Sequence, residues 1–368
     1  MVKIKFLISV GLALLLCKAS SGQNNWQFLE KRMTPARSYV VYKTPMAIQI
    51  DGVASESVWA DAEWTEFFVD IEGEDKPLPT WQTRVKMLWD DRYLYFFAEL
   101  EEPHVWAYYK DHDLILYHEN DFEIFIDPNG NTHHYFEFEF NAQNTLFDLF
   151  MTRPYRNGGI PLISWDAPGI KHAVSIDGTL NDPTDEDVGW TLEVAVPFEA
   201  LRTGIHTKIP KNGETWKVNF SRVQWETEIK DGKYHRKRDT ETGRILPEKN
   251  WVWSPQGLIN MHYPERWGNL QFSEKPVGES KVGFIMPGVE VFNNYLWRIY
   301  YKQMHYRQNH GHFANLLSEL EESDEVITSS GEKLTLELHA TNFQFFITGK
   351  TADGMVLNLD NHGLFQHK

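Results

Sequence analysis

Cysteine is almost absent from this chain, because Cys17 is the only one among 368 residues. A single cysteine cannot form an internal disulfide, so the fold must depend on a hydrophobic core. The composition allows a large core, since 42% of the residues are hydrophobic and 14% are aromatic.

Positive charge is also scarce, with 36 Lys and Arg against 52 Asp and Glu and a formal net charge of −16. This balance argues against nucleic acid as a partner, because phosphate contacts need clustered basic residues. It equally argues against an electrostatic attachment to anionic lipid. Neutral ligands and cations fit the charge better.

Long hydrophobic runs are missing, apart from Phe6–Leu16 near the start of the chain. Lys3 and Lys5 precede this run, and the small residues 19–22 follow it. This order predicts a signal peptide over residues 1–22 and export to the periplasm, cell surface or extracellular space. The run is too short to span a membrane, and no later stretch reaches about 18 apolar residues, so no membrane span is expected.

Several catalytic signatures are missing as well. The chain has no Gly-rich phosphate loop, nucleophile elbow or kinase motif. It also lacks the Cys-x-x-Cys-His motif of covalently attached haem.

Short strand-like runs separated by turn residues fill the chain from Tyr39 to Ser273. Residues 84–89 and 93–100 flank Asp90-Asp91 and predict a hairpin. The pattern as a whole predicts an all-β fold, an antiparallel β-sandwich over residues 39–273. Further strands are expected at 121–127, 134–141, 146–151, 189–196 and 215–224.

The character of the sequence changes after the polar, turn-rich stretch 273–281. Apolar residues at helical spacing predict a helix over 291–306 and a second short helix from Phe313 to Leu320. Strands at 334–338, 342–348 and 355–359 follow, the last two pairing across residues 352–354. We therefore expect a small α+β appendage over residues 281–368.

An ordered set of segments resembles carbohydrate-binding module family 9 and its DOMON-like relatives (those similar to the N-terminal domain of dopamine β-monooxygenase). The resemblance implies a β-sandwich of the DOMON-like or jelly-roll type that binds sugar. The segments are Ile50-Asp51-Gly52 with Trp59, Leu88–Asp91 with Tyr93–Tyr95, Asn120–Asp127, Gly189–Glu193 with Val196-Pro197, Trp216–Phe220 with Arg222, and Trp267–Leu270.

The resemblance also implies a binding slot in which two aromatic rings enclose a terminal sugar. Tyr117 falls at the place of one ring, and Glu123 matches an acidic contact. Glu139 stands where family members can carry an arginine, which reverses the charge there. For the second ring, Trp251 and Trp253 are the nearby candidates in a loop-like segment. A loop folded onto the edge of the sandwich, with both rings sealing the core, is the alternative.

The strands 121–127 and 135–141 alternate between apolar and acidic residues. Phe136, Phe138 and Phe140 point to one face, and Glu137 and Glu139 to the other. If the strands pair, like charges lie opposite one another, which is destabilising without compensation. A basic residue, a cation or a hydroxyl-rich ligand could compensate; a solvated outer face is the bland alternative. The basic candidates are Arg84, Lys86, Arg153, Arg156 and Arg222.

These observations predict a protein that binds oligo- or polysaccharide in polysaccharide utilisation, without catalysis and with no catalytic residue assigned. Tyr117, Trp251 and Trp253 would stack on the sugar. Its hydroxyls would be bound by Glu123, Glu139, Asn141 and Arg222. A glycoside hydrolase using paired carboxylates and a haem carrier using Met151 with His133 are the alternatives.

No cofactor is firmly indicated. A structural Ca²⁺ could bind the acidic segment Asp111–Asp113 near Glu101 and Glu102, although a bare acidic loop explains the same residues. The adjacent His133 and His134 would point to opposite faces of a strand and are expected to be turn-exposed rather than to share a metal.

Overall fold

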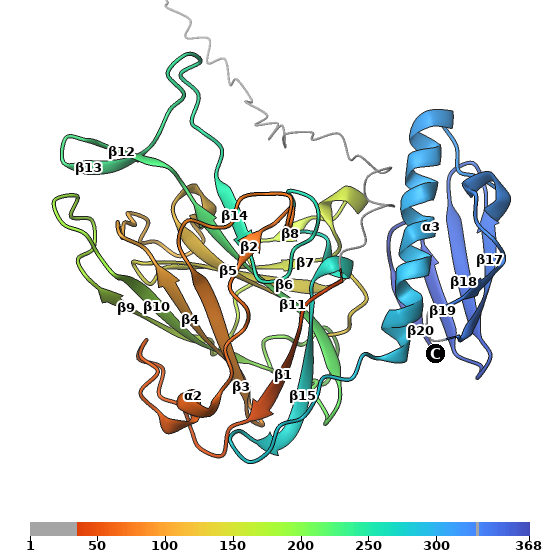
Figure 1. The fold of residues 1–368 in the computed structure, drawn as a ribbon, viewed down its shortest axis with the longest axis horizontal. Helices are drawn as coiled ribbons and strands as arrows, with labels where there is room; N and C mark the ends of the chain where they lie inside the picture. The colour runs from red at the N-terminus through yellow and green to blue at the C-terminus, as the bar shows by residue number, and fades with distance from the viewer. Residues whose placement is uncertain (1–34, 329–330) are drawn as a thin grey trace, which may run out of the picture.

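The computed structural model describes residues 35–328 and 331–368. A large β-sandwich comes first along the chain, and a smaller unit of one long helix and a five-stranded sheet follows it (Figure 1). Helices are few, so the predicted all-β sandwich with a small helical appendage is confirmed. The elements of the first region are β1 (Ser38–Lys43), α2 (Ser57–Asp61), β2 (Val69–Asp70), β3 (Thr83–Trp89), β4 (Tyr93–Glu101), η1 (Leu116–His118), β5 (Asp121–Asp127), β6 (Tyr135–Asn141), β7 (Leu146–Met151), η2 (Tyr155–Asn157), β8 (Pro161–Leu162), β9 (Lys171–Asp177), β10 (Gly189–Pro197), β11 (Thr215–Gln224), β12 (Thr227–Lys230), β13 (Lys233–Arg236), β14 (Lys249–Val252), η3 (Pro264–Arg266) and β15 (Gly268–Pro276).

The sandwich is one hydrogen-bonded sheet that folds over so that its two halves face each other. The strand order is β8-β7-β6-β5-β11-β15-β1-β3-β4-β10-β9, with β14 and β2 attached beside β11. Neighbours are antiparallel except around β1, which runs parallel to both β15 and β3. The predicted hairpin of β3 and β4 and the conditional pairing of β5 with β6 are both confirmed.

The core lies between the two halves of the folded sheet. Phe136, Phe138 and Phe140 are fully buried there, as their alternation along β6 predicts. They share this core with side chains of the opposite half, including Trp89 and Phe96. Burying a phenylalanine stabilises the fold by about 1.5–3 kcal/mol, so these strands are a main source of stability.

The outer face of β5, β6 and β7 is covered as well. A second apolar cluster on this face joins Phe125 and Tyr135 to Leu116, just before β5, and to Met261 and Trp267, which are far away in the sequence. The expectation of a solvated outer face is therefore wrong, because both faces of these strands are buried.

The second region packs one helix on one face of a small sheet. Its elements are α3 (Gly288–His310), η4 (Leu317–Leu320), β16 (Glu325–Ile327), β17 (Lys333–Ala340), β18 (Phe345–Thr351), β19 (Val356–Asp360) and β20 (Phe365–His367). Gly311 ends α3 in the left-handed conformation, at φ 78°. The expected second helix is no more than the short 3₁₀ turn η4, and β18 starts three residues later than predicted. The predicted pairing across residues 352–354 is confirmed.

The helical appendage contacts the sandwich through polar bonds, and α3 lies against a buried ion pair of the sandwich. Asn131 accepts a hydrogen bond from the backbone N–H of Phe365, and His133 Nε2 lies 3.1 Å from the carbonyl oxygen of His362. Arg156 Nη2 lies 2.9 Å from Glu265 Oε2, with both side chains at most 4% exposed. His133 is thus buried against the appendage, not exposed in a turn as expected.

We expect Glu265→Ala to lower the free energy of unfolding by about 3–5 kcal/mol, because Arg156 would remain buried without a charged partner. Urea unfolding of the variant measures this loss. Asp91→Ala, which removes the exposed ion pair with Lys43, is the control and should cost at most about 1 kcal/mol. Equal losses for the two variants would contradict this role for Glu265.

His133 should make the fold sensitive to acid. Burial lowers the pKa of His133 to about 4, although the His362 carbonyl and Asp360 raise it in part. The stabilisation is fully present above the unfolded pKa of about 6.5 and is lost as the pH falls toward 4, at most about 3 kcal/mol. In urea unfolding at pH 7 and pH 4, His133→Gln should lose less stability than the parent. The exposed His206→Gln should follow the parent, and parallel profiles for all three would contradict the assignment.

Candidate functional site

An acidic cluster lies on the outer face of β5 and β6. The register places Glu123 directly opposite Glu139, and alternation adds Asp121 and Glu137 to the same face. All four side chains are at most 5% exposed, because the loops around Leu116 and Met261 cover them. The sequence predicted this grouping but not its burial.

The cluster has few hydrogen bonds for its charge. Glu139 Oε2 accepts from the backbone N–H groups of Leu116 and Tyr117 at 2.9 and 3.1 Å. Ser221 of β11 is the residue directly opposite Glu123 in the strand register. Asp121 makes no full hydrogen bond with either oxygen.

Burial raises the pKa of every carboxyl in this cluster. The pKa of Glu123 rises to about 7, although the Ser221 hydroxyl lowers it in part. Burial and then the charges of Glu123 and Glu139 raise the pKa of Asp121 well above its usual range; the N–H of Val223 opposes this only weakly. The charged forms are therefore poorly stabilised by the protein itself.

The basic residues expected to balance this cluster bind elsewhere. Arg84 pairs with Glu99, Arg156 with Glu265, and Arg222 with Glu102. Lys86 donates to the carbonyl of Trp59, and Arg153 contacts His362. The expectation that one of these basic residues balances the cluster is therefore wrong. This holds for the described residues 35–328 and 331–368.

Trp251 and Trp253 share a face, as predicted, but that face is the core. They are 3% and 0% exposed, because residues 249–252 form β14 between β11 and β2 rather than a loop. Trp253 Nε1 donates to Glu66, and a Cβ on Gly268 would lie 2.2 Å from its ring. The two rings cannot stack on a sugar from solvent in this conformation, so we correct their assignment.

Arg222 and Asn141 are corrected as well. Arg222 alternates with Ser221 and so lies on the opposite face of β11 from Glu123. Asn141 accepts from the N–H groups of Gln143 and Thr145 and donates to the Tyr109 carbonyl, so its polar atoms are engaged within the protein. Of the predicted aromatic residues, Tyr117 is accessible, at 40% exposed.

A pocket lined by three tryptophans lies beside these residues and was missed by the sequence analysis. Trp81, Trp106 and Trp225 line this tryptophan pocket, a hollow of about 200 Å³. Trp81 is partly exposed, whereas Trp106 and Trp225 are 4% and 7% exposed, so Trp81 offers the most accessible ring. In the sequence, the one sign of this pocket is the high number of tryptophans, because the three rings come from three separate loops. The polar lining is formed by Glu102, His104, Asn120, Gln224, Glu226, Thr227 and Lys249.

Internal bonds hold the polar groups of the tryptophan pocket in fixed orientations. Arg222 donates to Glu102 Oε2 and to Gln224 Oε1, each at 3.0 Å. Asn120 Nδ2 also donates to Glu102 Oε2, and its oxygen accepts from the N–H of Trp225. Because Oε1 of Gln224 accepts from Arg222, the orientation of this amide group is fixed.

The predicted residues support the tryptophan pocket from behind. The ring of Trp251 lies edge-on to Trp81, with centroids 6.2 Å apart. The indole N–H of Trp225 donates to the carbonyl of Tyr117 at 2.9 Å. Arg222 and Trp251 therefore position the pocket lining rather than contact a ligand.

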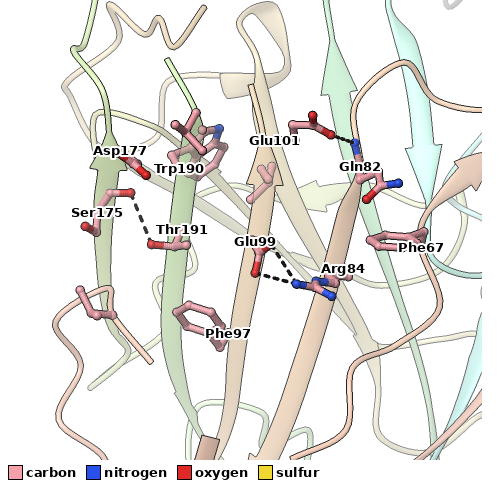
Figure 2. Close-up of a pocket in the computed structure, with 14 residues that line it drawn as sticks. Phe67, Gln82, Arg84, Phe97, Glu99, Glu101, Ser175, Asp177, Trp190 and Thr191 are labelled. Atoms are coloured by element: carbon pink, nitrogen blue, oxygen red, sulfur yellow. Dashed lines mark hydrogen bonds and ion pairs between the residues drawn. The ribbon is translucent and has the colours of Figure 1, made fainter. Parts of the chain in front are cut away.

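A larger groove of about 590 Å³ lies on the outer face of β3, β4, β10 and β9 (Figure 2). Arg84 Nη2 contacts both carboxylate oxygens of Glu99 at 3.1 and 3.2 Å. Phe67, which is 43% exposed, forms one wall. The strand register continues the polar row from Arg84 and Glu99 to Thr191 and Ser175.

The groove and the tryptophan pocket are lined by neighbouring residues of the chain at the ends of β3 and β4. Gln82 and Glu101 line the groove, whereas their chain neighbours Trp81 and Glu102 line the pocket. Gly189 forms part of the groove at φ 154°, where a Cβ would lie 2.1 Å from the carbonyl oxygen of Leu100.

The loop expected to bind calcium has different neighbours from those predicted. His112 Nε2 lies 2.9 Å from Asp148 Oδ1, and Asp113 and Asp166 complete this group. Glu102 is instead paired with Arg222, so the predicted grouping with Asp111–Asp113 is wrong.

Comparison with known proteins identifies the family. The model of the carbohydrate family 9 binding domain-like family matches residues 50–240, which is more than half of the chain. The chain belongs to this family. Within residues 35–328 and 331–368, we find no helix with the length and apolar composition needed to cross a membrane.

Solved structures similar to this family member include a proposed carbohydrate-binding protein from Bacteroides uniformis. It is 20% identical, with a TM-score of 0.46, and the match covers 65% of this chain and 100% of that one. A family 9 carbohydrate-binding module from Caldicellulosiruptor kristjanssonii matches in complex with glucose (15% identity, TM-score 0.38) and with cellotriose (16%, 0.37). Each of these covers 68% of this chain and 100% of the module. A comparison with curated proteins finds no match.

The burial of Trp253 can be tested by its effect on stability. We expect Trp253→Ala to lower the free energy of unfolding by about 3–5 kcal/mol, as for other large core residues. Tyr117→Ala is the control and should change it by less than about 1 kcal/mol, because that ring is largely exposed. Urea unfolding of both variants is the measurement; a small loss for Trp253→Ala would return this ring to the ligand candidates.

Proposed function

We propose that this protein binds carbohydrate without catalysis, at the tryptophan pocket. The observation that carries the proposal is that the partly exposed Trp81 and the largely buried Trp106 and Trp225 converge with a pre-oriented carboxylate and two carboxamides. Aromatic rings pack against the flat apolar faces of sugar rings, and fixed polar groups bind the hydroxyls. Membership of a carbohydrate-binding family supports the same function.

The charges around the pocket favour a neutral sugar. Glu102 is paired with Arg222 at 3.0 Å, and Glu226 lies 3.5 Å from Lys249. A ligand therefore meets few unbalanced charges and would contribute hydroxyls to acceptors that are already oriented. The ligands glucose and cellotriose in the related family 9 module are neutral sugars too.

The size of the two hollows supports a chain ligand. The pocket of about 200 Å³ is smaller than the roughly 300–1,000 Å³ of sites for drug-sized ligands, and so suits a single sugar ring. The adjoining groove of about 590 Å³ would contact further units of an oligo- or polysaccharide. Residues 1–22, the predicted signal peptide, lie outside the described residues; with them the proposal extends to an exported protein acting in polysaccharide utilisation.

The alternatives have less support in the geometry. A hydrolase would need two carboxylates across the scissile bond, but Glu123 and Glu139 are at most 5% exposed beneath loops. Assays for released sugar on the bound glycans test this reading. A haem carrier is tested by an absorption spectrum, in which a Soret band is the required result.

A glycan array followed by calorimetry tests carbohydrate binding. We expect neutral glycans to bind and Trp81→Ala to weaken binding at least about tenfold, which corresponds to about 1.4 kcal/mol of lost stacking. Phe343→Ala, an exposed ring in the appendage, is the matched control and should leave affinity unchanged. Thermal unfolding confirms that each variant is folded.

Phe67→Ala separates the pocket from the groove. We expect this variant to bind oligosaccharides more weakly and monosaccharides as the parent does. The reason is that Phe67 lines the groove but not the tryptophan pocket. The proposal is wrong if no glycan binds, or if the Trp81→Ala variant binds as the parent does.

A further inference from the structure

The acidic cluster brings several buried carboxyl groups close together without a basic side chain to balance them. One oxygen from each of Asp121, Glu123 and Glu139 can be chosen so that all three lie within 4.8 Å of one another. These residues are 0%, 5% and 2% exposed, so water does not screen their repulsion. Like charges this close and this buried require a positive partner or bound protons.

The described part of the chain supplies no basic partner for these three carboxylates. Among the ion pairs of residues 35–328 and 331–368, none involves Asp121, Glu123 or Glu139. Glu137, on the same face, adds a fourth carboxyl, and its contact in those pairs is His262 Nε2 at 3.9 Å. Burial lowers the pKa of His262 to about 3, so this ring is neutral and brings no positive charge.

Asp121 provides a second, independent indication of a ligand. It is fully buried and aimed into the cluster, yet neither oxygen makes a full hydrogen bond. Buried polar atoms in native proteins are nearly always satisfied, so an unsatisfied carboxylate here points to a group that binds it.

The donor set and spacing suit a hard divalent cation. Ca²⁺ binds oxygen ligands at 2.3–2.6 Å, so two ligands of one ion can be up to about 5.2 Å apart, and 4.8 Å fits. The three carboxylates offer oxygen alone, which disfavours zinc and copper. Mg²⁺ usually keeps several waters and is poorly suited to such an enclosed place.

We propose that Asp121, Glu123 and Glu139 bind one Ca²⁺ ion between β5 and β6. This site is separate from the Asp111–Asp113 loop and does not depend on the proposed carbohydrate binding. The ion neutralises Glu139, whose Oε2 accepts from the N–H groups of Leu116 and Tyr117. Because the Tyr117 carbonyl holds the indole of Trp225, the ion also stabilises one wall of the tryptophan pocket.

The test compares the full chain freed of metal with the same chain in excess calcium. Calcium should raise the midpoint of thermal unfolding by about 5 °C, and elemental analysis after gel filtration should find one calcium per chain. Asp121→Asn, which keeps the shape and removes one charge, should lose most of both responses. Asp113→Asn, in the other acidic group, is the matched control and should keep them.

If Asp121→Asn does not fold, Glu139→Gln and the metal content of the parent chain decide the question. The proposal is overturned if calcium neither binds nor stabilises the parent, or if Asp113→Asn rather than Asp121→Asn abolishes binding. Higher stability at low pH without any calcium response would show that the carboxyls share protons instead. Neither readout uses a sugar, so failure here leaves carbohydrate binding untouched.

Discussion

The two-residue alternation of β5 and β6 is the constraint on which much of this structure depends. It places phenylalanines on one face and carboxylates on the other, and both faces are buried. The phenylalanine face forms the centre of the sandwich core. The carboxylate face therefore has to be covered and balanced by groups from elsewhere in the chain.

The covering loops connect this buried face with the surface. Leu116 and Tyr117 donate to Glu139 on their inner side, while the carbonyl of Tyr117 accepts from Trp225 on the outer side. The lining of the tryptophan pocket is thus linked through Tyr117 to the carboxyl group of Glu139 in the interior. On the opposite face of β11, the buried Arg222 also supports the pocket lining, because it orients Glu102 and Gln224.

The appendage lies beyond the family match, which ends at residue 240, and it too supports the covering segments. Its helix α3 packs on a separate five-stranded sheet with its own apolar cluster, which also includes Tyr263 from the loop before η3. Arg156 and Glu265, both from the sandwich, lie against this helix, where Tyr301 donates to Glu265. The segment 261–267, which covers part of the acidic face, is thereby also bound by the appendage.

The sequence by itself determined the all-β class, the β3–β4 hairpin, the shared face of the carboxylates in each of β5 and β6, and the family resemblance. These follow from local spacing, because alternation states which residues share a face. Tertiary structure alone decided what covers each face. Trp251 and Trp253 share a face as predicted, yet pairing of β14 with β11 and β2 turned that face inward. The tryptophan pocket arises in the same way, since Trp81, Trp106 and Trp225 are distant in sequence and meet only because the sheet folds over on itself.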